Sequence, residues 1–389
     1  MTQKKISIIF AFILGFVGFV TSFGAHIVAV NLPTYAEKVG VGLGVIGVLI
    51  AAYDFAEIVA KPVFGALADK KGMKLTMLVG LVVFIIASLL YLIIPPQLLL
   101  LVRFLQGIGA AALSAVSLAL VGVYFKDNRG RAYGIYNAVK GAGYVLSPLV
   151  GGYIVLKSNF ATIFVASAII GIIAFILSLF LPKPSKGDQS PLDDDDNFSL
   201  KSFTAVFKQK ELLPWYVITV VNMFFVGILF GFLPIRIHEL HYSPFNTGLL
   251  ISVVALSYLL IQPVAGILAD KASVTKTITV GLILSAVSVI LIPFVKDIPL
   301  LLVSIVAGIG VGTVWTNTDT LMSNLAKEGK LGETMGIAGS FKEFGDMLGP
   351  LLIGMISQAF GLKIGFVTCG VLGLLCVVLI RRSSIIAGR

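Results

Sequence analysis

Residues 75–94 read LTMLVGLVVFIIASLLYLII, an apolar stretch without a single charged side chain. A run of this length is what an α-helix needs to cross the hydrocarbon core of a bilayer. The composition of the whole chain agrees: 58% of its 389 residues are hydrophobic and 12% are charged, and the mean hydropathy is +1.02. Soluble domains carry roughly 25% charged residues because their surface faces water. Most of the surface of this chain must therefore face lipid.

Similar apolar runs recur along the chain and predict an all-α membrane protein of about twelve transmembrane helices. Barrel strands would alternate apolar and polar residues, which these runs do not. Lys4 and Lys5 precede an apolar run, as in a signal peptide, but that run continues to about Pro33 and is predicted to remain as the first span. The predicted spans are residues 6–32, 43–67, 75–95, 98–125, 132–156, 161–182, 213–237, 246–269, 275–295, 298–324, 332–359 and 363–380.

Lysine and arginine are shared unevenly between the two sides of the membrane. Both termini and the connections on their side hold most of these residues, including Lys70, Lys71, Arg381 and Arg382. Connections with an excess of Lys and Arg stay in the cytoplasm. We therefore expect a multi-pass protein of the plasma (cell inner) membrane with both termini cytoplasmic.

The second half of the chain repeats the first at an offset of 201 or 202 residues. The pattern Pro-Val-x-Gly-x-Leu-Ala-Asp-Lys begins at Pro62 and again at Pro263, and Pro148-Leu returns as Pro350-Leu. Related halves that rock about a site near the membrane midplane are typical of transporters that work by alternating access. The predicted domains are two pseudo-symmetric six-helix bundles, at residues 1–182 and 213–389, joined by a cytoplasmic linker at 183–212.

The residues that enzyme and metal sites need are scarce. The sequence has three histidines and no HExxH, CxxC or P-loop pattern, and Cys369 and Cys376 share one apolar stretch, where they are interpreted as small packing residues. We therefore expect no catalytic activity, no cofactor and no metal. The net charge of +10 belongs to the connections between spans and does not indicate nucleic acid. The expected partners are a small-molecule substrate, protons and the lipid bilayer, with no obligate protein partner.

A glycine- and lysine-rich connection follows the second predicted span. Residues 65–74 read GALADKKGMK, and the start of this pattern returns at Gly266. This stretch resembles the signature cytoplasmic loop of the major facilitator superfamily, and the chain as a whole resembles the drug:proton antiporter branch of that family. The resemblance implies that Asp69 holds the cytoplasmic side shut; the alternative is a positively charged loop without a gating role. The residues of the implied gate are Gly65, Asp69, Gly72, Lys74 and Asp270.

Arg103 lies inside the fourth predicted span, in the sequence LVRFLQGIGAA of residues 101–111. An arginine there costs at least ~2.5 kcal/mol and normally faces the protein interior or a water-filled cavity. The equivalent residue of the second half is Ser304, so the fold itself does not require an arginine. This stretch resembles the span-four motif of the family, which implies that Arg103 takes part in proton handling.

Residues 143–152 read GYVLSPLVGG and resemble the span-five motif that is associated with antiporters rather than symporters of the family. Small residues and proline let helices approach closely and bend, so a packing role is the alternative to a role in exchange. Ser147 stands where the family usually has glycine. The residues of this antiporter-type motif are Gly143, Ser147, Pro148, Gly151 and Gly152.

Acidic residues inside spans are the candidates for proton coupling. Asp54, Glu57 and Lys61 are spaced to share one face of the second span, whereas the second half has Ala255, Tyr258 and Gln262 at these positions. A carboxyl group away from water can exchange a proton near neutral pH, so we hypothesise that Asp54 or Glu57 carries the proton. The alternative is a set of static ion pairs with lysines of the spans. The proton-coupling candidates are Asp54, Glu57, Arg103, Glu343 and Asp346, and their charge partners are Lys61, Lys140 and Lys342.

Aromatic residues of the second half can line an apolar cavity, although packing or lipid-facing roles are the alternative. The substrate-cavity candidates are Phe224, Tyr258 and Trp315. Together these features lead us to expect a secondary active transporter, a proton-coupled antiporter that exports small lipophilic or drug-like compounds. The alternatives on the same fold are a symporter or uniporter of a metabolite or sugar, and a lipid flippase. A membrane sensor without transport is the alternative from a different class.

Overall fold

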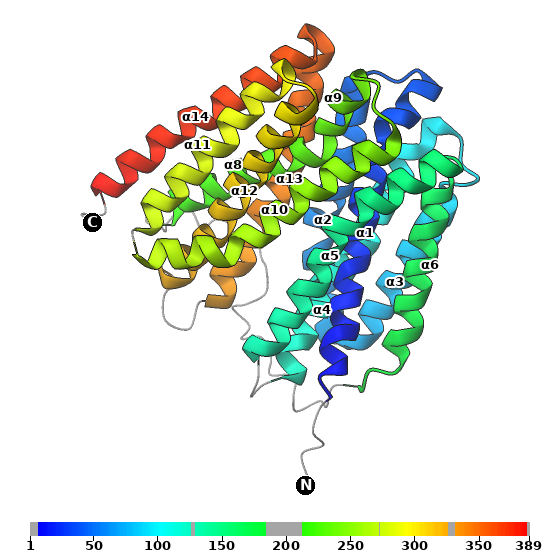
Figure 1. Cartoon of the computed structure of the whole chain (residues 1–389). Coiled ribbons are helices and arrows are strands. Elements are labelled where there is room, and N and C mark those ends of the chain that lie inside the picture. The colour runs from blue at the N-terminus through cyan, green and yellow to red at the C-terminus, as the bar shows by residue number, and fades with distance from the viewer. Residues whose placement is uncertain (1–6, 126–128, 184–211, 272, 326–330, 387–389) are drawn as a thin grey trace.

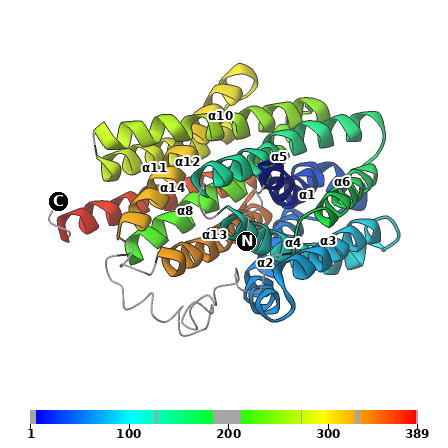
Figure 2. The same cartoon turned by 90° about the horizontal axis from the view of Figure 1, so that it is seen from below.

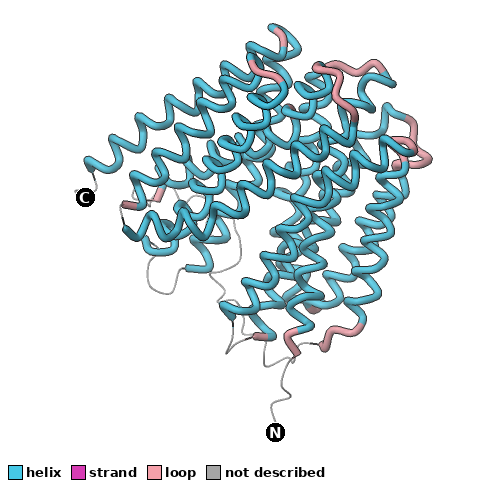
Figure 3. Tube along the Cα trace, viewed as in Figure 1, coloured by secondary structure: helices cyan, strands magenta, loops and turns pink. Residues whose placement is uncertain are grey.

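The computed structural model describes residues 7–125, 129–183, 212–271, 273–325 and 331–386, and these residues form helices and no strand (Figure 3). The helices of the first half are α1 (Ile9–Val39), α2 (Leu43–Lys71), α3 (Met73–Leu90), α4 (Leu99–Tyr124), α5 (Arg129–Lys157) and α6 (Thr162–Leu179). Those of the second half are α8 (Leu213–Gly231), α9 (Leu233–Glu239), α10 (Pro244–Lys271), α11 (Val274–Leu291), α12 (Asp297–Leu325), α13 (Leu331–Phe360) and α14 (Leu362–Ile386). Short 3₁₀ helices, η1 (Pro96–Leu98) and η3 (Ile292–Phe294), complete the described elements.

Each predicted span coincides with one of these helices or, in one case, with a pair of them. Ten stretches of the described chain are long and apolar enough to cross a bilayer. Two further predicted spans correspond to α13, which carries charged residues in its middle, and to α14, whose apolar part is the shorter stretch Leu362–Val377. The predicted all-α membrane fold is therefore confirmed.

The seventh predicted span differs from the expectation of one continuous helix. It divides into α8 and α9 at Phe232, directly before Leu233 and Pro234. Proline has no N–H to donate to the preceding turn and its ring clashes there, so it is tolerated in the first turn of a new helix. The two pieces together still form one apolar span, Leu213–Glu239.

The outer surface of the molecule is apolar. Large side chains such as Val63, Phe180 and Leu260 are exposed. Contiguous apolar surface of this kind is unfavourable in water, whereas lipid tails accept it, and every helix satisfies its own backbone hydrogen bonds there.

The helices form two bundles, one from α1 to α6 and one from α8 to α14 (Figure 1). Seen from below, the bundles lie side by side, with α2 against α13 and α5 against α10 (Figure 2). We call the side of the molecule where α1 begins and α2 ends the basic end, because Lys70 and Lys71 lie there, and the other side the opposite end.

Glycines bring the two bundles into backbone contact near the opposite end. A Cβ added to Gly47 of α2 would meet the carbonyl group of Pro350 of α13. A Cβ added to Gly248 of α10 would meet the carbonyl group of Pro148 of α5. Ser252 Oγ also donates a hydrogen bond of 2.6 Å across this second contact. The bundles are closed against each other at this end.

The basic end shows the contrary arrangement. Gly65 of α2, Gly134 of α5 and Gly339 of α13 lie near it, and no described residue outside their own helices brings an atom within 4 Å of an added Cβ. The ribbons of the two bundles likewise diverge toward the side of the N-terminus (Figure 1). Among the described helices, the halves therefore stand apart at the basic end.

Candidate functional site

The charged face of α2 meets α13 at the contact between the two bundles. Lys61 Nζ lies 3.0 Å from Glu57 Oε2 on its own helix and 2.6 Å from Glu343 Oε1 on α13. Ser114 Oγ of α4 donates a hydrogen bond of 3.4 Å to the other oxygen of Glu57. One ammonium group thus joins two carboxylates, one from each half, which compensates charges that are costly inside a membrane.

Asp54 lies one helical turn before Glu57 and is buried, with 8% of its surface exposed. Its largest charge interaction is with Asp346 of α13, followed by Glu343. Within the described residues neither Asp54 nor Asp346 has an ion pair or a side-chain hydrogen bond. The acidic site therefore has an ion-paired part, around Lys61, and two carboxylates without an ion pair, Asp54 and Asp346, contributed by different halves. The charge of Arg103 acts on Asp54 and that of Lys61 on Asp346 at longer range.

The two other predicted charge partners lie on equivalent positions of α5 and α13. Lys140 has no ion pair in the part of the chain that the structure describes, although its charge acts on Glu57 and Glu343 at longer range. Lys342 Nζ lies 2.6 Å from Asp319 Oδ2 of α12. Asp319 is a residue that the sequence reasoning missed. The available signal was its position as an acid inside the predicted span 298–324.

A row of aromatic rings crosses from one half to the other. The His26 ring centroid lies 4.6 Å from that of Tyr144 and 4.5 Å from that of Phe230. Tyr144 lies 5.9 Å from Tyr258, which lies 5.6 Å from Trp315. We call these five residues the aromatic row. Its residues lie on α1, α5, α8, α10 and α12, so both bundles contribute to it.

The aromatic row lies close to the charged residues. The Lys342 ammonium group lies 4.9 Å from the centroid of the Trp315 ring, and the charge of Asp346 acts on both Tyr144 and Tyr258. Phe230 and Tyr258 also line a narrow, otherwise apolar cavity. The third predicted cavity residue, Phe224, lies outside the row and packs on Phe225 with centroids 5.8 Å apart.

Arg103 is buried in the first bundle, with 2% of its surface exposed. Its Nη1 donates to Gln106 Oε1 at 3.0 Å and its Nη2 donates to the carbonyl oxygen of Ala25 at 3.1 Å. The guanidinium carbon also lies 4.5 Å from the centroid of the Tyr53 ring. None of the described acidic residues forms an ion pair with it.

The predicted gate residues are only partly described. Gly72 turns the chain from α2 into α3 with a φ of 98°, a conformation that favours glycine. Lys74 Nζ donates to the carbonyl oxygens of Leu179, at 2.8 Å, and Leu181, where a cation complements the end of α6. The side chains of Asp69 and Asp270 lie outside the described residues. The implied gate therefore stays a prediction.

The small residues of the antiporter-type motif contact two different helices, α1 and α10. A Cβ on Gly143 would lie 2.8 Å from Ser22 Cβ, and one on Gly151 would lie 2.8 Å from Ile27 Cγ1, so both glycines face α1 within the first bundle. Gly152 and Pro148 instead meet α10 of the second bundle. Ser147 is fully buried between these positions. The motif thus joins packing inside one half to packing between the halves.

The described residues contain no group of three or more His, Cys, Asp or Glu residues that could hold a metal ion. The site consists of carboxylates, ammonium groups and aromatic rings. Such groups can exchange protons and bind an organic compound.

Comparison with known proteins identifies the family of this chain. The chain matches the Major Facilitator Superfamily over residues 14–236 and 215–384. It belongs to the major facilitator superfamily. The predicted resemblance to this family is therefore confirmed.

Named relatives of this major facilitator are resistance proteins. The chain is 26% identical over 364 residues to the quinolone resistance protein NorA of Staphylococcus aureus (strain COL), with 89% of each chain covered. It is 27% identical over 367 residues to the multidrug resistance protein MdtG of Salmonella choleraesuis (strain SC-B67), with 91% of this chain and 90% of that protein covered. The crystal structure of the nucleoside transporter NupG is similar with a TM-score of 0.80 at 13% identity, covering 97% of this chain and 98% of that chain. This last likeness shows the fold alone.

Proposed function

We propose that this major facilitator is a proton-coupled antiporter that exports small lipophilic compounds by alternating access. The observation that carries the proposal is the acidic site between the halves. Glu57 and Glu343 share Lys61, while Asp54 and Asp346 have no cation of their own among the described residues. The names of the relatives NorA and MdtG support drug-like compounds as the substrate class.

Charge balance explains how protons and a substrate exchange at such a site. The four carboxylates outnumber the nearby ammonium groups of Lys61 and Lys140. A proton bound by Asp54 and Asp346 removes the repulsion between them, and its release restores that repulsion. A lipophilic cation can balance the same charge. The two therefore compete for one site, which is the condition for exchange rather than cotransport.

The aromatic row provides the contact surface for the apolar part of the substrate. Ring faces attract organic cations as well as apolar groups, by about 0.5–2 kcal/mol for each cation–π contact. Because both halves contribute rings, a bound compound touches both bundles, and its affinity changes when the bundles rock.

The pH difference across the membrane supplies the free energy for this exchange, because one proton traded for one monovalent cation moves no net charge. Each pH unit corresponds to about 1.4 kcal/mol, which sustains about a tenfold gradient of the exported cation. The distribution of Lys and Arg supports the basic end as the cytoplasmic side. The bundles stand apart at that end, so the structure would correspond to the state that takes up substrate from the cytoplasm.

The test is movement of a lipophilic fluorescent cation in everted membrane vesicles driven by an imposed proton gradient. We expect gradient-dependent uptake by the intact protein and its loss in Asp54→Asn. The matched control is Asp297→Asn, which makes the same chemical change at the opposite end. Asp297 accepts a hydrogen bond from Tyr242 and is not part of the acidic site. This control should transport like the intact protein.

Two outcomes would contradict the proposal. Normal gradient-driven transport by both Asp54→Asn and Glu57→Gln would remove these acids from the proton path. Absence of dye movement in the intact protein, beside a control exporter that works in the same vesicles, would remove lipophilic cations as the substrate class. Accumulation of a metabolite in whole cells would then favour a symporter or uniporter.

A further inference from the structure

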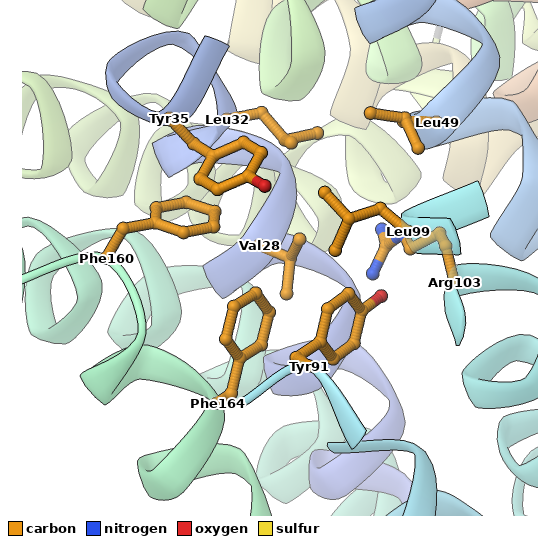
Figure 4. Close-up of a pocket in the computed structure, with 9 residues that line it drawn as sticks. All are labelled: Val28, Leu32, Tyr35, Leu49, Tyr91, Leu99, Arg103, Phe160 and Phe164. Atoms are coloured by element: carbon orange, nitrogen blue, oxygen red, sulfur yellow. The ribbon is translucent and has the colours of Figure 1, made fainter. Parts of the chain in front are cut away.

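Arg103 and Lys342 are both cations inside spans, but they differ in what can reach them. Arg103 is buried in the first bundle, beside a cavity that is lined by five segments and is too narrow for an organic ligand (Figure 4). The side chain of Lys342 on α13 is 17% exposed. Gly339 lies three residues before it on the same helix face, and no described atom outside its helix comes within 4 Å of an added Cβ. Lys342 therefore lies beside open space at the basic end, where the bundles stand apart.

The Lys342 ammonium group occupies a small site that α12 provides. Its Nζ donates a hydrogen bond of 2.6 Å to Asp319 Oδ2 and lies 4.9 Å from the centroid of the Trp315 ring. Tyr258 packs beside this ring, with centroids 5.6 Å apart, and the charge of Asp319 acts on it. A carboxylate next to an aromatic face is a combination that binds organic ammonium ions. We call Asp319 and Trp315 the ammonium site.

The ammonium site has an acceptor atom that Lys342 does not use. Asp319 Oδ1 is buried and has no hydrogen-bond partner among the described residues. A carboxylate offers about four lone-pair sites, so this second oxygen can accept from a further N–H group. The first half has no counterpart of the site, since Ser114 and Leu118 stand at the positions equivalent to Trp315 and Asp319. The fold itself therefore does not require these residues.

The ion pair between Lys342 and Asp319 is one that a ligand can displace. Both side chains are partly exposed, and ion pairs of this kind contribute little to stability. The flexible lysine side chain can turn toward the open space beside Gly339 and keep its charge in contact with water there. Lys342 therefore acts as a ligand that is tethered to its own site, and an amine from outside competes with it.

We propose that the ammonium site binds lipophilic protonated amines, and that Lys342 occupies it when no amine is bound. The amine nitrogen takes the place of Nζ, donates to the Asp319 carboxylate and lies against the Trp315 ring, while the apolar part of the compound extends into the space beside Gly339. Because this contact needs an N–H donor, protonated amines bind more tightly than quaternary ammonium ions. The inference rests on the proposed export of lipophilic cations and names amines as the substrate class.

The test is isothermal titration calorimetry of the full-length protein in a nonionic detergent, without a proton gradient. The probes are 2-naphthylmethylamine, which is protonated at neutral pH, its trimethylated quaternary analogue and the neutral 2-naphthylmethanol. We expect the amine to bind roughly tenfold tighter than either analogue, since a hydrogen bond between charged groups contributes more than a contact without one. Asp319→Asn should remove this preference, because the amide keeps the shape of the carboxylate without its charge.

Lys342→Met shows whether the lysine competes with the amine. Removal of a weakly held competitor should tighten amine binding by about fivefold and leave the binding of 2-naphthylmethanol unchanged. The matched control is Lys296→Met, which makes the same change at an exposed lysine of the opposite end and should bind the amine like the intact protein. Thermal unfolding shows whether each variant is folded. If Asp319→Asn does not fold, the double variant with Lys342→Met takes its place, since it leaves no unpaired lysine.

Equal binding of the three probes, absence of binding by all of them, or unchanged amine affinity in Lys342→Met overturns the inference. If Asp54→Asn abolishes the amine preference and Asp319→Asn does not, the amine binds at the acidic site, and the export proposal stands without the ammonium site. The expected binding pattern in a protein that moves no lipophilic cation in vesicles would support the ammonium site and contradict export.

Discussion

The two halves of the molecule pack through the same residues and differ in the residues that carry charge. Gly107 of α4 lies against α2 at Tyr53 and Ala56, and Gly308 of α12 lies against α10 at Val254 and Ser257, the equivalent positions. Helix approach thus follows one plan in both bundles, with small residues where backbones meet.

Lys140 and Lys342 are equivalent, but most other charged positions inside the spans do not repeat. Asp54, Glu57 and Lys61 of α2 correspond to Ala255, Tyr258 and Gln262 of α10, and the buried Arg103 corresponds to the buried Ser304. The comparison teaches that both halves need these glycines for packing, whereas the charges of Asp54, Glu57, Lys61 and Arg103 occur in the first half only and are not required by the fold. A residue that carries charge in one half alone is therefore a candidate for function.

Replacing Lys61 by the residue of the other half is expected to have the largest effect. Lys61→Gln leaves Glu57 and Glu343 between the bundles without their shared cation. Removal of one partner of a fully buried ion pair costs about 3–5 kcal/mol, and the partial exposure of Lys61 and Glu343 places this variant at the low end or below. We expect a lower Tm and at least about tenfold slower gradient-driven dye transport.

The control for Lys61→Gln is Lys61→Arg, measured for Tm and for transport. It keeps a cation between Glu57 and Glu343 and should affect both quantities less than Lys61→Gln does. Wild-type transport by Lys61→Gln would show that the contrast between the halves has no functional meaning at this position.

The shared packing plan predicts equal effects at equivalent glycines. Gly107→Val and Gly308→Val both force a side chain against a neighbouring helix, at Tyr53 and at Val254. Overpacking of this kind costs about 1–3 kcal/mol, so we expect both variants to lower the Tm by similar amounts. Gly134→Val is the control for the loss of glycine itself, since no described atom outside its helix lies near an added Cβ. A large drop for only one of the two glycines would break the equivalence of the halves.

The smallest expected effect distinguishes the two equivalent lysines. Lys342 has Asp319 as its partner, whereas Lys140 has none among the described residues because Leu118 occupies the position equivalent to Asp319. A double-mutant cycle of Asp319→Leu and Lys342→Met should give a coupling energy of about 1 kcal/mol or less, since the pair is partly exposed. Lys140→Met combined with Asp319→Leu should give none. Measured unfolding free energies that show equal coupling for both lysines would contradict the assignment.

The sequence was sufficient for the helices and for contacts within one helix. Apolar runs give the spans, and the spacing of four residues puts Glu57 beside Lys61 on α2. Repetition at a fixed offset gives the two bundles. Hydropathy did not predict the break at Pro234, which begins a new helix inside a predicted span.

The contacts between helices were beyond sequence reasoning. Glu343 and Lys61 are far apart in the chain, and the sequence around each of them does not indicate that they form an ion pair. Asp319 was overlooked for the same reason, because its importance comes from Lys342 on a neighbouring helix. The cavity at Arg103 requires five segments to assemble before its shape exists.

The backbone contacts at the opposite end have a property in common with the interface of a two-fold homodimer. In one contact the first half supplies glycine (Gly47) and the second supplies proline (Pro350); in the other the roles are exchanged between Gly248 and Pro148. Such an interface is isologous, so each half holds both complementary surfaces. If one bundle rocks about a line that is perpendicular to this two-fold axis and lies in the interface, both contacts change in the same way. In such a motion the closed end opens as one unit, without one contact separating before the other.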